Sequence, residues 1–229
     1  MVKVVFSQLA LRQIEGHGTS DLRRELGGVL LGHATQSGST NMVKVAAAIP
    51  VQTDDHGPVH FTFTADTWAQ LHKDREERYP KLDVVGWYHT HPDLGVFYSA
   101  DDLVVHSAAF VLPWQVGLVL DPLRGEHCLV GWHLKEGSNV DRDLAGLPGY
   151  YELLDHQNSS AISWRFSEAA IWRQGGYLPS SITDSGEVYT PASDWPALPF
   201  ISPWWGVFLG GLSLLISLLL LLERLLGGA

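Results

Sequence analysis

A pair of histidines behind an apolar run constrains the fold of this chain more than any other feature. The run Leu82–Trp87 is typical of a buried β-strand, and His89 and His91 follow it closely. Side chains two positions apart lie on the same side of a strand, so both imidazoles can face one metal ion. Pro92 is expected to end the strand. The pattern therefore predicts a strand that leads into a pair of metal-ligating histidines.

A helical pattern follows the histidines after a loop. It runs from Ser99 to Leu112 and places Asp102 in its first turn, facing back toward the histidines. Two imidazoles and one carboxylate suit zinc and leave the fourth tetrahedral position open for water. A simpler interpretation stays open, in which Ser99 and Asp102 are a helix N-cap and its acidic third residue, and the histidines are packed or solvated. The two roles of Asp102 are compatible.

The charge and the cysteine content of the chain exclude several kinds of site. The 229 residues carry a formal net charge of -10, which argues against a nucleic-acid surface. The single cysteine, Cys128, excludes an internal disulfide framework and a cysteine-rich zinc site. It lies in an apolar stretch, so we expect a small core residue and not a nucleophile. Hydrophobic residues make up 45% of the chain, enough for a sizeable core.

Strands and helices alternate along residues 1–136, which we expect to form one domain. The pattern predicts strands at 2–6, 28–31, 42–51, 59–64, 82–87, 115–121 and 127–134, and helices at 8–14, 20–26, 65–78 and 99–112. The glycines of Gly16–Gly18 are expected to interrupt the first helix, in which Leu9, Leu11 and Ile14 face inward. The alternation predicts a mixed α/β fold with a sheet in the middle and helices on both sides.

Glu25 and His106 each have two interpretations. Glu25 lies near the end of the predicted helix 20–26, and taken alone it is typical of a solvated helix carboxylate. His106 comes four residues after Asp102, a helical spacing that brings it near the same face. A half-buried structural histidine is favoured there over a contact with the metal.

The chain changes character after residue 136. Residues 137–203 are predicted to be an extension that leads into a flexible linker, because they are rich in Gly, Pro and Ser. Within them, Ile162–Phe166 alternates like an edge strand, and Trp164 is expected to pack against the main domain.

Residues 204–222 are the second strong signal in the sequence. They contain 19 residues without a charge, long enough as a helix to cross roughly 30 Å of hydrocarbon. A buried core helix is the alternative, and it would have to be apolar all round. Because the N-terminus lacks the apolar core of a signal peptide, we expect a membrane tail anchor with the preceding residues in the cytoplasm.

The motifs together resemble a known family, the JAMM (MPN-type) zinc metalloproteases. Its signature is an upstream Glu followed by His-x-His-Pro and then Ser-x-x-Asp. Glu25–Gly32 resembles the Glu-bearing segment, and Tyr79-Pro80, Gly86–Tyr88 and Phe110–Pro122 resemble the flanking blocks. The resemblance covers roughly residues 2–135. It implies a cytidine-deaminase-like MPN fold, with a catalytic domain at residues 1–136.

The resemblance also implies zinc-dependent amide hydrolysis. A Zn2+ ion held by His89, His91 and Asp102 would lower the pKa of water and polarise the scissile carbonyl. Glu25 would be the general base, and Ser99 would donate a hydrogen bond to the oxyanion. The implied substrate is the C-terminal Gly-Gly tail of ubiquitin or of a ubiquitin-like protein, joined through an isopeptide or peptide bond.

Other readings of the resemblance stay open. The chain could trim a small sulphur-carrier protein, could be a non-catalytic MPN scaffold, or could resemble the DNA-repair-associated members, which the acidic charge disfavours. The scaffold is disfavoured by the intact set of signature residues. Phe97 and Tyr98, by position alone, could line a groove for an extended peptide. Assembly with identical or different chains is also left open.

Overall fold

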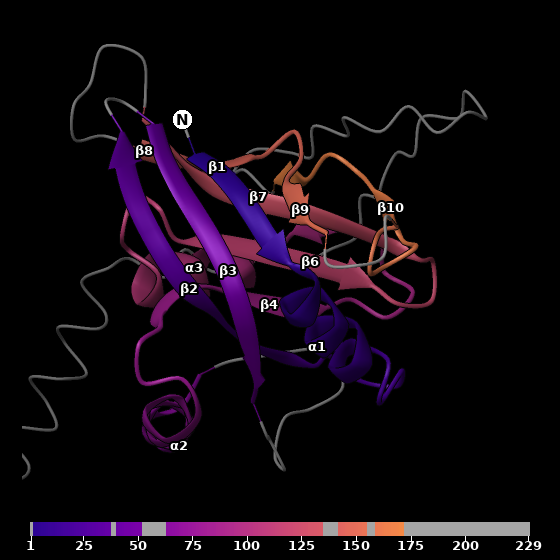
Figure 1. Ribbon diagram of the computed structural model, residues 1–229. Helices are drawn as coiled ribbons and strands as arrows, with labels where there is room; N and C mark the ends of the chain where they lie inside the picture. The colour runs from indigo at the N-terminus through magenta and orange to yellow at the C-terminus, as the bar shows by residue number, and fades with distance from the viewer. Residues whose placement is uncertain (1, 38–39, 52–62, 135–141, 155–158, 172–229) are drawn as a thin grey trace, which may run out of the picture. The chain divides into compact units, whose positions relative to one another are not determined.

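The computed structural model describes residues 2–37, 40–51, 63–134, 142–154 and 159–171, which are drawn in colour in Figure 1. The predicted linker and the predicted span at 204–222 lie outside these residues, and so do residues 59–62 of one predicted strand. No helix in the described part of the chain is both long and apolar enough to cross a bilayer. The membrane anchor therefore stays a prediction.

One mixed β-sheet forms the centre of the described residues. Its strands are β1 (Val2–Ser7), β2 (Gly27–Ser37), β3 (Thr40–Pro50), β4 (Asp83–Thr90), β6 (Val116–Asp121), β7 (Glu126–Leu134), β8 (Arg142–Gly146), β9 (Tyr151–Leu153) and β10 (Arg165–Phe166). They are joined in the order β10-β7-β6-β4-β2-β3-β1-β9, and β8 also pairs with β7. β4 runs parallel to β6 and antiparallel to β2. Figure 1 shows the long β2–β3 hairpin crossing the direction of β4, β6 and β7 steeply, so the sheet is strongly twisted.

Helices cover both faces of this sheet. They are α1 (Gln8–Gly18), α2 (Ala65–Arg78) and α3 (Ala100–Ala109). On one face α1 packs Leu11 into a core that includes Tyr88. On the other face α2 contributes Leu71 to a core that includes Trp87, and α3 packs Leu103 against it. Trp87 and Tyr88 are neighbours on β4, and alternation along the strand sends them to opposite faces. The predicted mixed sheet between helices is confirmed.

The first helix is longer than predicted. α1 begins after its N-cap Ser7 and continues through Gly16 to Gly18. Burial of Leu11 and of the residues around it outweighs the modest helix penalty of Gly16 and Gly18. The prediction that Leu9 faces inward is wrong, since half of its surface is exposed.

The predicted second helix at 20–26 is absent from the structure. These residues form turns that lead into β2. The Asp21 carboxylate accepts hydrogen bonds from the backbone N–H and the guanidinium of Arg23, each at 3.0 Å. Such a local bond from side chain to backbone competes with helix formation. Glu25 consequently lies in an extended approach to β2 and not on a helix.

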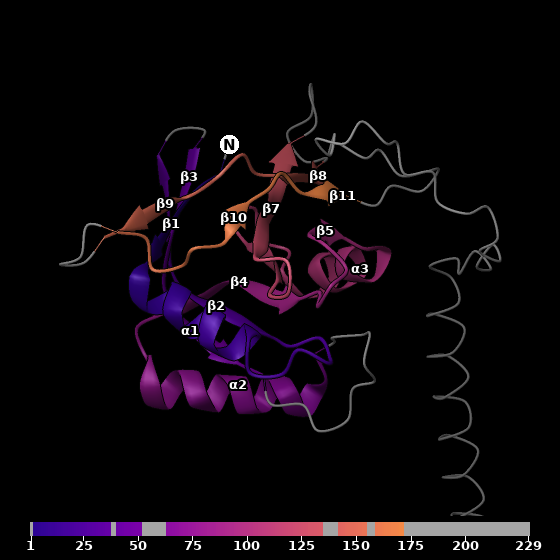
Figure 2. The same ribbon diagram turned by 90° about the vertical axis from the view of Figure 1, so that its right-hand side faces the viewer.

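The extension beyond residue 136 contributes to the same sheet. β8 and β10 both pair with β7, and β9 pairs with β1. The predicted edge strand appears as β10, and Trp164 packs partly buried against the core as expected. A separate two-stranded sheet joins β5 (Phe97–Tyr98) to β11 (Ala170–Ile171), and Figure 2 shows β5 beside α3.

Candidate metal centre

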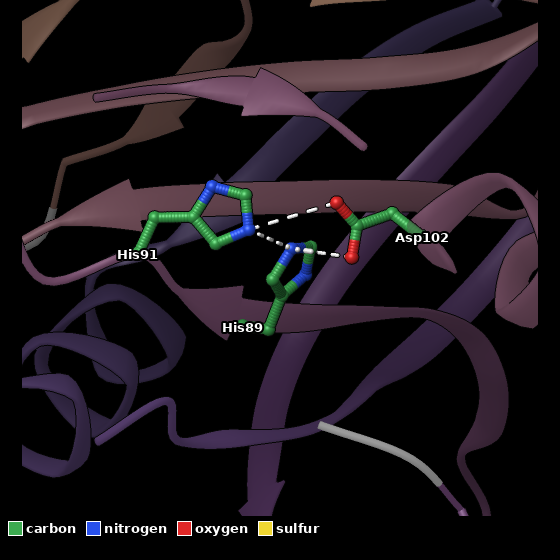
Figure 3. Close-up of side chains that lie close together, drawn as sticks. All are labelled: His89, His91 and Asp102. Carbon is green, nitrogen blue, oxygen red and sulfur yellow. Dashed lines mark hydrogen bonds and ion pairs between the residues drawn. The ribbon is translucent and has the colours of Figure 1, made fainter. Parts of the chain in front are cut away.

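His89, His91 and Asp102 come together as the sequence predicted. His89 lies on β4, His91 follows the end of that strand, and Asp102 lies in the first turn of α3. His89 Nε2 is 3.1 Å from His91 Nε2 and 3.0 Å from Asp102 Oδ1, while His91 Nε2 is 3.6 Å from Asp102 Oδ2. Figure 3 shows the two rings and the carboxylate converging on one point, and all three residues are buried.

This geometry fits a metal ion with tetrahedral coordination. One donor atom from each of the three residues lies within 4.8 Å of the others. In a tetrahedral zinc site with bonds of about 2.0–2.2 Å, neighbouring donor atoms are roughly 3.3–3.6 Å apart. The three separations therefore lie close to the edges of such a site. Two nitrogens and one oxygen are also a donor set that suits zinc.

The electrostatics of the cluster keep its donor atoms available. Burial lowers the pKa of His91 to about 4, with a further contribution from His89, so this imidazole is neutral near pH 7. Burial alone would raise the pKa of Asp102, but His89, His91 and Ser99 together hold it below its usual range. Metal ligands must be neutral imidazoles and ionised carboxylates, and these shifts favour both states.

Asp102 serves the helix as well as the cluster. Its Oδ2 accepts the backbone N–H of Ser99 at 2.7 Å, and Ser99 Oγ accepts the backbone N–H of Asp102 at 3.1 Å. This is a reciprocal capping box at the start of α3. The carboxylate thus holds the helix with one oxygen and faces His89 with the other. Accepting that bond does not use the hydroxyl hydrogen of Ser99, which stays chemically able to donate.

Aromatic rings fix the orientation of His89. Trp87 stacks on the His89 ring with centroids 4.4 Å apart. The Trp87 indole N–H donates to His106 Nδ1 at 3.1 Å, and Tyr98 OH lies 2.8 Å from the same nitrogen. Because an indole N–H can only donate, Nδ1 of His106 is unprotonated. Burial lowers the pKa of His106 to about 3, so it stays neutral.

Two expectations about these residues need correction. His106 is fully buried and not half-buried, and it lies outside the metal cluster as a support for Trp87. Tyr98 cannot line a substrate groove because it is also fully buried. Phe97 is partly exposed, and its ring centroid lies 4.7 Å from that of His91. The pairing of β5 with β11 turns Tyr98 inward, a long-range contact that the local sequence does not reveal.

Glu25 lies at the edge of the cluster. Its Oε1 is 3.8 Å from His91 Nε2, and the residue is only 9% exposed. The alternative of a solvated helix carboxylate is wrong for this residue. A carboxylate beside the ligand set, but not among the three clustered donors, is where a general base would act.

Asp121 is a residue of the site that the sequence pattern missed. It lies at the end of β6, fully buried, and its carboxylate accepts four backbone N–H groups at 2.7–3.1 Å. Two of them belong to Asp93 and Gly95, in the loop that follows His91, so the loop is tied to β6. The strand-ending Asp-Pro at 121–122 is the sequence signal that could have indicated this role.

Comparison with known proteins gives the family. A profile described as "Prokaryotic homologs of the JAB domain" matches residues 7–133. A protein named "NAD(+) hydrolase TcpA" from Theionarchaea archaeon (strain DG-70-1) is 32% identical over 125 residues, 54% of this chain and 35% of its own length. The 26S proteasome non-ATPase regulatory subunit 14 of Caenorhabditis elegans is 29% identical over 126 residues, 53% of this chain and 38% of its own length.

A solution structure of a Desulfitobacterium hafniense protein is also similar, with 19% identity and a TM-score of 0.46 over 67% of this chain and 94% of that one. The match spans little more than a third of either curated relative. The profile covers more than half of the chain, and its span contains the whole metal cluster together with Glu25 and Ser99. A JAMM/MPN-type domain is therefore confirmed, and the chain belongs to the family of prokaryotic homologues of the JAB domain.

Proposed function

We propose that the protein is a zinc-dependent peptidase or isopeptidase that cleaves the amide bond after the C-terminal tail of ubiquitin or a ubiquitin-like protein. One observation carries this proposal. Three buried donor atoms from His89, His91 and Asp102 converge at the spacing of a tetrahedral zinc site, with the Glu25 carboxylate 3.8 Å from one of them. A scaffold has no need to hold a carboxylate beside an intact ligand set.

The residues divide the chemistry among them. Zinc held by His89, His91 and Asp102 would supply Lewis acidity, which activates water and polarises a carbonyl. Glu25 accepts a proton from the attacking water and returns it to the leaving amine. Ser99 donates its hydroxyl hydrogen to the oxygen on which negative charge develops. No nucleophilic side chain is required, which agrees with the burial of Cys128 in the core.

The substrate class rests on the family. The motifs resemble metallopeptidases that act on ubiquitin tails, and one relative is by name a subunit of the 26S proteasome. The partly exposed Phe97 beside His91 offers an apolar contact next to the cluster. A small sulphur-carrier protein with a similar tail is the nearest alternative substrate.

The first test measures metal and cleavage together on the purified full chain. We expect one zinc per chain and release of a fluorophore joined to the C-terminal glycine of ubiquitin. Glu25→Gln should retain zinc and lose about a hundredfold or more in turnover, because the proton acceptor is gone. Glu76→Gln is the matched control, since Glu76 lies on α2 with a side chain that is 72% exposed.

The outcomes separate the alternatives. Cleavage of a sulphur-carrier protein but not of ubiquitin changes the substrate and keeps the chemistry. Consumption of NAD+, measured because one relative is named as an NAD+ hydrolase, would replace the proposal if Glu25→Gln abolished it. Zinc binding without any turnover would support a scaffold, and absence of zinc would refute the proposal.

We also propose that residues 204–222 tether the protein to a membrane, with the metal centre on the cytoplasmic side. Support comes from 19 consecutive residues without charge, long enough as a helix to cross the hydrocarbon of a bilayer. Extraction of membranes at high pH tests the tether, and protease protection tests the side. Recovery of the full chain in the soluble fraction would refute it.

A further inference from the structure

Thr90 lies between the two histidines of the cluster but faces away from it. Side chains alternate along a strand, so the side chain of Thr90 points to the face opposite His89. Thr90 is fully buried there. Its methyl group lies close to α1, since a Cβ built on Gly18 would be 3.2 Å from Thr90 Cγ2. One side of Thr90 is thus held against the helix.

The polar groups of Thr90 hold a single residue, Leu26. The backbone N–H of Thr90 donates to the Leu26 carbonyl at 2.8 Å, and Thr90 Oγ1 accepts the backbone N–H of Leu26 at 2.9 Å. In a regular antiparallel pair the second bond would run from the Leu26 N–H to the Thr90 carbonyl. The hydroxyl takes the place of that carbonyl just before the paired residues Gly27 and His89.

Leu26 is the residue directly after Glu25. Fixing both backbone groups of Leu26 fixes the direction in which the chain enters β2 at Gly27, and with it the point from which the Glu25 side chain starts. The residues before Leu26 form turns, so the hydrogen bonds between β2 and β4 do not extend to Glu25 itself. The bond to Thr90 therefore links the strand that carries His89 to the residue next to Glu25.

We propose that Thr90 is a positioning residue for Glu25, acting through the Leu26 amide. The inference rests on the proposed function, in which Glu25 is the general base. It assigns Thr90 no contact with substrate or metal. Its hydroxyl is needed only as the acceptor that holds the backbone next to the base.

The test replaces the hydroxyl while keeping the shape. Thr90→Val has nearly the same volume but no acceptor, whereas Thr90→Ser keeps the acceptor and loses the methyl group. In the full chain we expect Thr90→Val to lower kcat by about tenfold to a hundredfold, because small misplacements of a catalytic group have effects of that size. KM and zinc affinity should stay within about threefold of wild type. Thr90→Ser should restore kcat, and Thr35→Val, at an exposed position of β2, should change nothing.

A double-mutant cycle distinguishes positioning from general damage. In a Glu25→Gln background, Thr90→Val should lower kcat no further, because the group that it positions is already absent. An equal loss in both backgrounds would overturn the proposal. So would a wild-type kcat in Thr90→Val, or a loss of zinc affinity as large as the loss of kcat.

Measurements on metal-free protein keep the inference independent of turnover. Thr90→Val should speed hydrogen exchange at the Leu26 amide and shift the carboxyl carbon resonance of Glu25, and Thr90→Ser should restore both. If wild-type protein binds zinc and cleaves nothing, the proposed function fails, while these signals still decide whether Thr90 positions Glu25. Unchanged signals overturn that role. If Thr90→Val does not fold, the comparison of Thr90→Ser with Thr90→Ala takes its place.

Discussion

At the scale of single residues, hydrogen bonds hold the polar side chains near the metal centre. The local sequence predicts some of these bonds and not others. The capping role of Ser99 and Asp102 was readable because both partners lie within four residues of each other. The roles of Asp121 and Thr90 depend on contacts made 26 and 64 residues away, so the local sequence does not identify their partners. Short-range bonds of the site could be predicted, and long-range ones could not.

His127 gives a prediction at the same scale. It is buried on β7, with Nε2 3.0 Å from the Tyr150 hydroxyl. Burial lowers its pKa to about 4, partly opposed by the backbone of Arg165. The folded state therefore favours neutral His127, so this stability is complete above pH of about 6.5 and is lost as pH falls toward 4.

The expected loss in unfolding free energy over that window is on the order of 3 kcal/mol. His127→Gln should lessen the acid dependence of urea unfolding in the presence of a chelator, which removes any effect of metal release. His133→Gln is the matched control, since His133 is exposed on the same strand. A His127→Gln profile parallel to wild type would contradict the assigned shift.

At the scale of elements, the sequence predicts best where periodicity and capping agree. α2 spans Ala65–Arg78 as predicted, because Thr64 caps it and a charged face follows its apolar positions. The predicted helix at 99–112 begins one residue later and ends at Ala109, where the Phe110 N–H closes the last turn. The predicted helix at 20–26 fails because a local side-chain bond of Asp21 competes with it.

Gly86 is the element-scale prediction. It lies on β4 where that strand pairs with β6, and an added Cβ would be 2.1 Å from the Val116 carbonyl oxygen. Gly86→Ala must push the two strands apart, and we expect a loss of about 1–3 kcal/mol or more in unfolding free energy. Zinc affinity should fall as well, because the same strand carries His89.

Gly16→Ala provides the contrast for this measurement. Gly16 is an exposed position of α1, and a Cβ there would meet nothing within 4 Å. It should raise stability by about 0.5–1 kcal/mol through helix propensity. Denaturant unfolding of both variants checks the pair. Equal effects would show that strand separation at β4 and β6 does not govern stability.

At the scale of the whole molecule, the described sheet continues past the end of the family match. The profile ends at residue 133, but β8, β9 and β10 extend the sheet beyond it. The general α/β architecture followed from the alternation of patterns, whereas the order of the strands did not. Strand order depends on which strand edges meet in space. β9 and β10 are so short that their sequences do not indicate which strand each one pairs with. The predicted domain boundary at 136 stays a prediction.

This arrangement predicts how the chain responds to shortening. A chain that ends at residue 136 loses β8 and β10, which pair with β7, and the buried side chains of Leu144 and Ile162. Each buried side chain of this kind contributes about 1.5–3 kcal/mol. We expect the shortened chain to unfold at a clearly lower urea concentration than a chain that ends at residue 171. Tryptophan fluorescence measures the unfolding of both. Equal midpoints would show that the extension is dispensable for stability.

The shared carboxylate of Asp102 has a consequence for how sequences of this kind are compared. Selection for a stable helix start would preserve Ser99 and Asp102 even in a descendant without metal chemistry, because each accepts the backbone N–H of the other at the start of α3. The presence of Ser99 and Asp102 alone is therefore weak evidence of catalytic activity. His89 and His91 satisfy no such requirement of the helix. They are therefore the residues that indicate whether a related sequence still encodes an enzyme.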